Sequence, residues 1–193
     1  MNENFIKING ANFYYELHGD AKNQPLVLIS GYTADHLTWQ PVLNELSKHY
    51  YVLIFDNRAV GQTKDDDREL SLELMADDTV ALIEKLNLKS PVAIGHSMGG
   101  AIVQVMAAKY GERLKGICIL NAPYKWRNAA IEFMTTIYFL IESSAALQIV
   151  FGLTLALVFG QQFLAEAENR ENFIKTALAN PHPQNICDKS RQL

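Results

Sequence analysis

A single serine stands between two glycines at the junction of a strand pattern and a helix pattern. The stretch reads VAIGHSMGG over residues 92–100, with a short apolar run before it and a helical pattern over 99–110. The order G-x-S-x-G in this context predicts a sharp strand-to-helix turn, because the chain needs small residues two positions before and after the serine. Ser97 is then held clear of the sheet, where the N–H groups of the helix can stabilise a developing negative charge.

Short apolar runs alternate with helical patterns along the chain. The expected strands are 5–8, 13–17, 26–29, 51–55, 92–94 and 116–120, and the expected helices are 39–48, 72–86 and 99–110. The middle runs are apolar throughout, as in parallel strands that are buried on both faces. Asn9-Gly10, between the first two runs, suits a tight hairpin turn. The alternation predicts an α/β fold with a mostly parallel sheet and flanking helices.

The pattern changes after Pro123. Residues from about 125 to 175 read as helical and strongly apolar with no strand candidate, so we predict a core over 1–123 and a separate helical region over 124–193. Residues 143–165 hold 23 positions without a charge, a length that could span a bilayer. Its interior polar residues, and the lack of flanking Lys or Arg, favour buried or lid-like helices broken near Gly152 or Gly160. A lid that contacts a membrane surface is the alternative.

Composition excludes several classes of protein. The chain has 193 residues, 20% of them charged, a formal net charge of −4 and 49% apolar residues, which argues against a basic nucleic-acid-binding protein and against a disordered chain. Cys118 and Cys187 lie far apart without metal-ligand spacing. No motif calls for a metal, nucleotide or prosthetic group, so we expect no cofactor. The first residues contain no apolar run of signal-peptide length, which predicts a cytoplasmic location.

Three blocks of sequence carry a resemblance to the α/β-hydrolase superfamily: ISGYTADHLTW at 29–39, FDNRAVGQT at 55–63, and the serine turn. The chain looks most like bacterial serine hydrolases of the esterase, enol-lactonase and proline iminopeptidase type. The resemblance implies that Ser97 is the nucleophile and that the backbone N–H groups of Tyr32 and Met98 bind the oxyanion. It also implies that the helical region over 124–193 is a cap or lid, and that the substrate is an ester, lactone, thioester or small amide. Ser97 excludes the branches with an aspartate nucleophile, such as epoxide hydrolases.

Some positions depart from the family pattern. The first block begins Ser30-Gly31 where the family usually has His-Gly, a change that leaves the backbone donor in place. The second block has Ala59 where glycine is usual and Thr63 where serine is frequent. If the backbone at Ala59 has a positive φ, the methyl group costs about 1 kcal/mol or more.

The base expected for the serine is missing. The resemblance implies the chain order Ser, then an acid, then His, but only His182 follows the serine turn. His182 lies between two prolines with no strand before it, which favours a loop histidine. His96 is expected to pack beside the turn, and His36 to lie in a loop.

Asp56 reads as a structural residue with Arg58 as its partner. The resemblance also implies two further strands, which would carry the acid and lead to the histidine, so we expect the C-terminal part of the fold to be absent. The chain is then weakly active or inactive. The alternative is a non-catalytic, hydrolase-like protein that binds a ligand or a partner. The exposed edge at 116–120 and the apolar lid would favour self-association.

Overall fold

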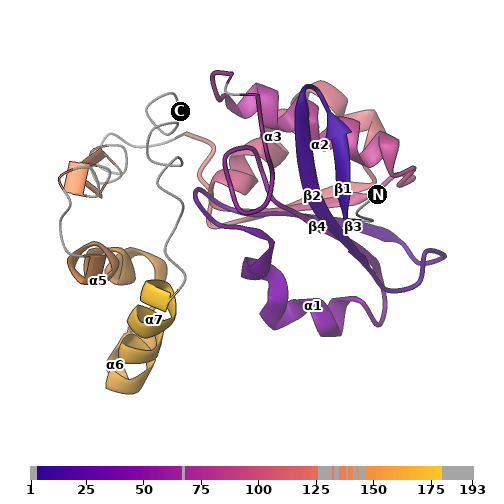
Figure 1. Ribbon diagram of the computed structural model, residues 1–193. Coiled ribbons are helices and arrows are strands. Elements are labelled where there is room, and N and C mark those ends of the chain that lie inside the picture. Colours follow the sequence, from indigo (N-terminus) through magenta and orange to yellow (C-terminus); the bar gives the residue numbers. More distant parts are fainter. Residues whose placement is uncertain are drawn as a thin grey trace. The chain divides into compact units, whose positions relative to one another are not determined.

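The computed structural model describes residues 4–66, 68–125 and 147–179, together with 132, 135–137, 139, 140 and 143. The chain divides into two compact units, and the boundary lies between Tyr124 and Lys125 (Figure 1). The first unit contains, in order, β1 (Phe5–Ile8), β2 (Ala11–His18), β3 (Pro25–Ile29), the 3-10 helix η1 (His36–Trp39), α1 (Gln40–Leu46), β4 (Tyr51–Phe55), α2 (Leu72–Lys85), β5 (Val92–His96), α3 (Met98–Tyr110), the 3-10 helix η2 (Gly111–Arg113) and β6 (Gly116–Leu120). The second contains α5 (Leu147–Val158), α6 (Gln161–Ala165) and α7 (Ala167–Ala179).

The strands of the first unit form one sheet in the order β1-β2-β4-β3-β5-β6. The pairs β3–β4, β3–β5 and β5–β6 are parallel, whereas β1 and β2 join as an antiparallel hairpin. This arrangement confirms the predicted α/β class with a mostly parallel sheet. Among the described residues β6 pairs only with β5, so it forms an edge of the sheet. Its apolar side chains at 117, 119 and 120 are 43%, 38% and 39% exposed.

Helices cover both faces of the sheet, because the side chains of a strand point alternately to its two faces. Along β3, Val27 and Ile29 pack into the core on the side of α2 and α3, and Leu26 and Leu28 pack against α1. Figure 1 shows α1 on one side of the sheet and α2 and α3 on the other. Because β3 pairs in parallel with both β4 and β5, the carboxyl ends of these three strands lie side by side at one end of the sheet.

The hairpin turn follows from the residues that form it. Asn9 and Gly10 have φ values of 44° and 86°, and Ile8 pairs with Ala11 across them. Two consecutive positive φ values match the right-handed twist of a two-residue hairpin, and Asn-Gly adopts them with little strain. The turn predicted from this dipeptide is confirmed.

The helix expected at 39–48 has a different beginning. A 3-10 turn at His36–Trp39 precedes α1, and the Asp35 carboxylate caps it by accepting a hydrogen bond from the Leu37 N–H. The sequence pattern missed this turn because a 3-10 segment buries residues at a spacing other than the 3.6 of an α-helix. The turn buries His36, which we expected to be an ordinary loop residue.

In the second unit, aromatic contacts join the helices. The rings of Phe159 and Phe163 stack at a centroid distance of 4.1 Å, and Phe173 of α7 meets Phe151 and Phe159 edge to face. α5 continues through Gly152, so the expected break occurs only at Gly160, before α6. No helix in the described part of the chain is long and apolar enough to cross a membrane.

Candidate active site

Ser97 lies at the point where β5 ends and α3 begins. Its backbone has φ 55° and ψ −121°, an arrangement that L-residues rarely adopt and that costs of the order of 1–3 kcal/mol. Hydrogen bonds on both sides hold it there: the Ser97 N–H donates to the Leu120 carbonyl at 2.9 Å, and the Ser97 carbonyl accepts from the Gly100 N–H at 2.9 Å. The half-buried side chain is thereby fixed at the N-terminus of a 13-residue helix.

The glycines around Ser97 are required by close backbone contacts. A Cβ atom on Gly95 would lie 2.1 Å from the Gly99 carbonyl oxygen, and one on Gly99 would lie 2.1 Å from the Ile29 carbonyl oxygen. Neither position can hold a side chain unless the backbone moves. The first turn of α3 can therefore lie directly against the end of β3, and both glycines are needed for the sharp turn, as the G-x-S-x-G spacing predicts.

The loop after β3 reaches the same place. A Cβ atom on Gly31 would lie 3.1 Å from Ser97 Cβ and 3.3 Å from the His96 carbonyl oxygen. The loop closes on itself through the Ala34 N–H and the Gly31 carbonyl, at 3.3 Å. The structure thus brings Gly31 into contact with Ser97, with Tyr32 next in the loop, and Met98 follows Ser97 as the first residue of α3.

No candidate base is bonded to the serine in the part of the chain that the structure describes. No histidine or carboxylate there forms a hydrogen bond with Ser97 Oγ. His96 lies beside Gly31 and contacts the loop after β3: its Nδ1 is 3.7 Å from where a Cβ on Gly31 would stand. His182 falls outside the described residues. A group of three or more metal-ligating side chains is also absent from the described residues.

The predicted pairing of Asp56 with Arg58 is wrong. Asp56, fully buried directly after β4, accepts two hydrogen bonds from His36 at the same oxygen, 2.8 Å from the backbone N and 2.7 Å from Nδ1. Its other oxygen accepts the Gln62 N–H at 2.7 Å. Because β3 and β4 are parallel neighbours, the loops that follow them lie together, and His36 takes the position beside Asp56 that we expected Arg58 to take.

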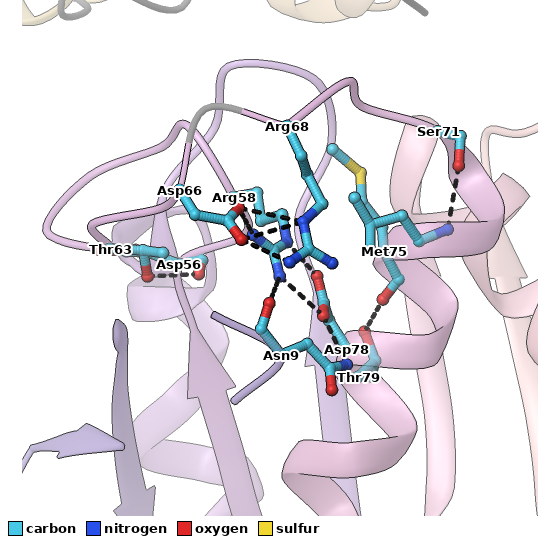
Figure 2. Close-up of polar contacts among 11 residues, drawn as sticks. Asn9, Asp56, Arg58, Thr63, Asp66, Arg68, Ser71, Met75, Asp78 and Thr79 are labelled. Carbon is cyan, nitrogen blue, oxygen red and sulfur yellow. Dashed lines mark hydrogen bonds and ion pairs between the residues drawn. The ribbon is translucent and has the colours of Figure 1, made fainter. Parts of the chain in front are cut away.

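Arg58 instead turns toward α2 (Figure 2). Its guanidinium donates hydrogen bonds to both oxygens of Asp78, to Asp66 Oδ1 at 2.9 Å and to the Asn9 carbonyl at 2.8 Å. The Arg58 and Asp78 side chains are 0% and 2% exposed. One buried cation therefore ties the loop after β4 to the hairpin turn and to α2.

The second block contains two positive φ values. Ala59 has φ 61°, as the comparison with the family pattern led us to consider, and Gly61 has φ 54°. A Cβ on Gly61 would lie 2.1 Å from Asp56 Oδ2. Glycine at 61 therefore leaves the space that the Asp56 carboxylate occupies.

A second carboxylate lies near His36. Glu16 Oε1 accepts the Tyr14 hydroxyl at 2.5 Å and lies 3.7 Å from His36 Nε2, and its other oxygen is 2.8 Å from His18 Nε2. Burial raises the pKa of Glu16, but the hydrogen bonds from Tyr14 and His18 outweigh it, so the pKa lies below its usual value. Sequence reasoning missed the contacts of His36 because they depend on strand order. The one available signal was that His36 and Asp56 each follow a buried strand.

Comparisons with known proteins identify the family of the chain. The model of a family described as "alpha/beta hydrolase fold" matches residues 24–142. A hydrolase of (E)-2-((N-methylformamido)methylene)succinate from Acinetobacter baylyi is 32% identical over 124 residues, which are 64% of this chain and 46% of that protein. Epoxide hydrolase 3 of Xenopus tropicalis is 26% identical over 121 residues, or 62% of this chain and 33% of its own. The chain thus spans less than half the length of these relatives.

Among solved structures, the enol-lactonase of Burkholderia xenovorans LB400 superposes with a TM-score of 0.79 at 19% identity, covering 96% of this chain and 72% of that one. A hydrolase from Pseudomonas aeruginosa gives a TM-score of 0.78 at 22% identity, covering 96% and 69% of the two chains. At these identities the likeness shows the fold alone. The family model, however, covers more than half of this sequence, including the serine turn and both loops beside it. The chain therefore belongs to the alpha/beta hydrolase fold family.

Proposed function

We propose that this chain carries the nucleophile and oxyanion site of a serine hydrolase that acts on a carboxylic acyl compound: an ester, lactone, thioester or small amide. The observation that carries the proposal is the positive φ of Ser97, 55°, maintained by glycines whose neighbours leave no room for a side chain. Backbone strain of this kind persists only where the surrounding structure holds it, and it concentrates at functional sites.

The proposed reaction has two steps. Ser97 Oγ attacks the carbonyl carbon, its proton passes to a base, and the bond to the leaving alcohol, thiol or amine breaks to form an acyl-enzyme. Water then attacks the acyl carbon and releases the acid. During both steps the N–H groups of Tyr32 and Met98 would hold the negative oxygen, and the N-terminal end of α3 would add a favourable dipole.

The names of the relatives support a carbonyl substrate. One relative is named as a hydrolase of an N-methylformamido compound, and one solved neighbour is an enol-lactonase; an amide and a lactone are both carbonyl compounds. An epoxide hydrolase is also among the relatives, but a serine in place of an aspartate favours acyl transfer for this chain. Since no base is bonded to Ser97 in the described part, we expect the 193-residue chain to be weakly active or inactive.

The test is labelling of the purified chain with a fluorophosphonate, which reacts with activated serines. We expect a slow adduct on Ser97, located by mass spectrometry, and none in Ser97→Ala. Ser143→Ala, which removes an exposed serine in the second unit, is the matched control and should label like the wild type. An adduct that persists in Ser97→Ala, or a folded wild type that never labels, would contradict the proposal.

The absence of a base bonded to Ser97 among the described residues favours a second candidate, a hydrolase-like protein that binds an acyl compound without turning it over. This candidate predicts that a non-hydrolysable ester analogue raises Tm, and that above its Kd the shift grows with the logarithm of its concentration. It also predicts that p-nitrophenyl acetate is hydrolysed no faster by the wild type than by Ser97→Ala. Hydrolysis dependent on Ser97 would exclude it.

A further inference from the structure

Asp56 is the fully buried side chain at which three segments near the proposed site meet. Its Oδ1 accepts two hydrogen bonds from His36, and its Oδ2 accepts the Gln62 N–H. Its backbone carbonyl accepts the Thr63 hydroxyl at 2.7 Å, a contact that Figure 2 shows. A carboxylate only accepts hydrogen bonds, so the Nδ1–H group of His36 is the donor in this contact. Two N–H groups of one residue thus hold a single carboxylate oxygen.

We propose that the Asp56–His36 pair positions the loop of Gly31 and Tyr32 beside Ser97, with Asp56 acting through His36. The inference rests on the proposed function in one respect, the assignment of an oxyanion N–H to Tyr32. Neither Asp56 nor His36 touches the substrate in this proposal, and both act by fixing the backbone that does.

The loop contains a residue with a strained backbone and is held at both of its ends. It leaves β3 at Ser30, which is fully buried and whose carbonyl accepts Asn57 Nδ2 at 3.4 Å. Inside the loop Thr33 has a positive φ of 59°, and the Ser30 hydroxyl donates to the Asp35 carbonyl at 2.9 Å. The far end of the loop is fixed where the His36 backbone and ring both bind Asp56.

The surroundings of the pair are built around this contact. Glycine at 61 leaves room for Asp56 Oδ2, since a Cβ there would stand 2.1 Å from it. The Tyr14 ring packs on the His36 ring with centroids 4.8 Å apart, and Glu16 faces the far ring nitrogen at 3.7 Å. These contacts hold the His36 ring in the orientation that directs Nδ1 at Asp56.

Hydrogen exchange of the intact chain, followed by mass spectrometry, tests the proposal without requiring activity. We compare His36→Asn, whose amide nitrogen can occupy the place of Nδ1, with His36→Gln, whose amide reaches further, and with His36→Leu. In His36→Leu and His36→Gln, amides of residues 30–36 should exchange at least about tenfold faster than in the wild type, while peptides of β3 and β4 keep their protection. His36→Asn should restore most of the protection.

The control is His49→Leu, which removes a histidine with a 69% exposed side chain and should leave all peptides unchanged. Unchanged exchange at 30–36 in His36→Leu would overturn the proposal. So would equal behaviour of the Asn and Gln variants, or equally faster exchange in every strand, because the pair would then stabilise the whole fold and not the loop. Fluorophosphonate labelling of Ser97 in the same variants separates the two proposals: a wild type that does not label contradicts the hydrolase function, whereas the exchange result still decides the role of Asp56.

Discussion

Gly31 lies so close to Ser97 that a Cβ atom on the glycine would be 3.1 Å from Ser97 Cβ. This separation is tighter than an ordinary van der Waals contact, so a methyl group there must push the loop or the serine by a few tenths of an ångström. We expect Gly31→Ala to slow fluorophosphonate labelling of Ser97 by about ten- to hundredfold, because small displacements of reacting groups have effects of this size.

The matched control for Gly31→Ala is Gly111→Ala, since a Cβ on Gly111 meets nothing within 4 Å. This variant should label at the wild-type rate. Equal labelling rates for the two alanine variants would show that the contact between Gly31 and Ser97 has no effect on reactivity.

Ala59 has a φ of 61°, at which an L-residue is less stable than glycine. Glycine removes a conformational strain of about 1–2 kcal/mol, offset by about 0.5–1 kcal/mol of extra backbone entropy that glycine loses on folding. We therefore expect Ala59→Gly to raise the free energy of unfolding by up to about 1.5 kcal/mol, and Ala59→Val, with a branched side chain, to lower it. Urea titration measures both, and a lower stability for Ala59→Gly would mean that packing of the buried methyl group outweighs the strain.

Arg58 and Asp78 form a buried ion pair, and its two partners cannot be removed singly without leaving a charge inside the protein. Asp78→Ala should destabilise the fold by about 3–5 kcal/mol, as seen when one member of a buried pair is lost. Asp66→Ala, which removes the partner that is 29% exposed, should lower stability much less, because solvent screens that contact. Urea unfolding followed by tryptophan fluorescence compares them; similar losses in both variants would contradict this assignment.

Asp77 joins α2 to α3 through Lys109 at 2.6 Å and the Tyr110 hydroxyl at 2.7 Å. Burial raises the pKa of Asp77, but these two hydrogen bonds outweigh it and leave the pKa below its usual value. A carboxyl group with a lowered pKa stabilises the folded state above its unfolded pKa, and this stabilisation is lost as the pH falls through the folded value. The loss therefore occurs below about pH 4.

The side chains of Asp77 and Lys109 are both 40% exposed, so solvent screens the pair and it contributes less than about 1 kcal/mol. We expect Asp77→Asn to lower Tm by at most about 2–4 °C at pH 7 and to differ less from the wild type at pH 3. Glu69→Gln, at an exposed position, serves as the control and should follow the wild type at both pH values. A difference that grows toward pH 3 would reverse the assigned sign.

Local patterns predicted most of the elements. β4 and β6 have the expected bounds, and α2 ends one residue before the expected position, because apolar runs and helical spacing are properties of consecutive residues. The turn at Asn9-Gly10 and the backbone around Ser97 were also predicted from neighbouring residues alone. These are the places where the chemistry of a few adjacent side chains decides the conformation.

Partners across the fold could not be predicted in the same way. His36 meets Asp56 and Arg58 meets Asp78, and each pair is separated by 20 positions in the chain. The positions of these residues in the sequence do not distinguish the observed pairs from the expected pair, Asp56 with Arg58. The choice follows from strand order, which places β3 beside β4, and from the packing of α2 against the hairpin turn. The sequence predicted the turn that holds Ser97, but no base is hydrogen-bonded to this serine among the described residues.

The position of β3 in the sheet also has a consequence for how the chain folds as it is synthesised. One edge of β3 pairs with β4, 51–55. The other edge pairs with β5, 92–96, which leaves the ribosome about 40 residues after β4. At roughly 5–20 residues per second the delay lasts about 2–8 seconds. During that interval one edge of the apolar strand β3 is unpaired. The loop after β3 also lacks the serine turn against which it packs in the folded chain. The nascent chain is therefore exposed to chaperones and to misassembly until Ser97 has left the ribosome.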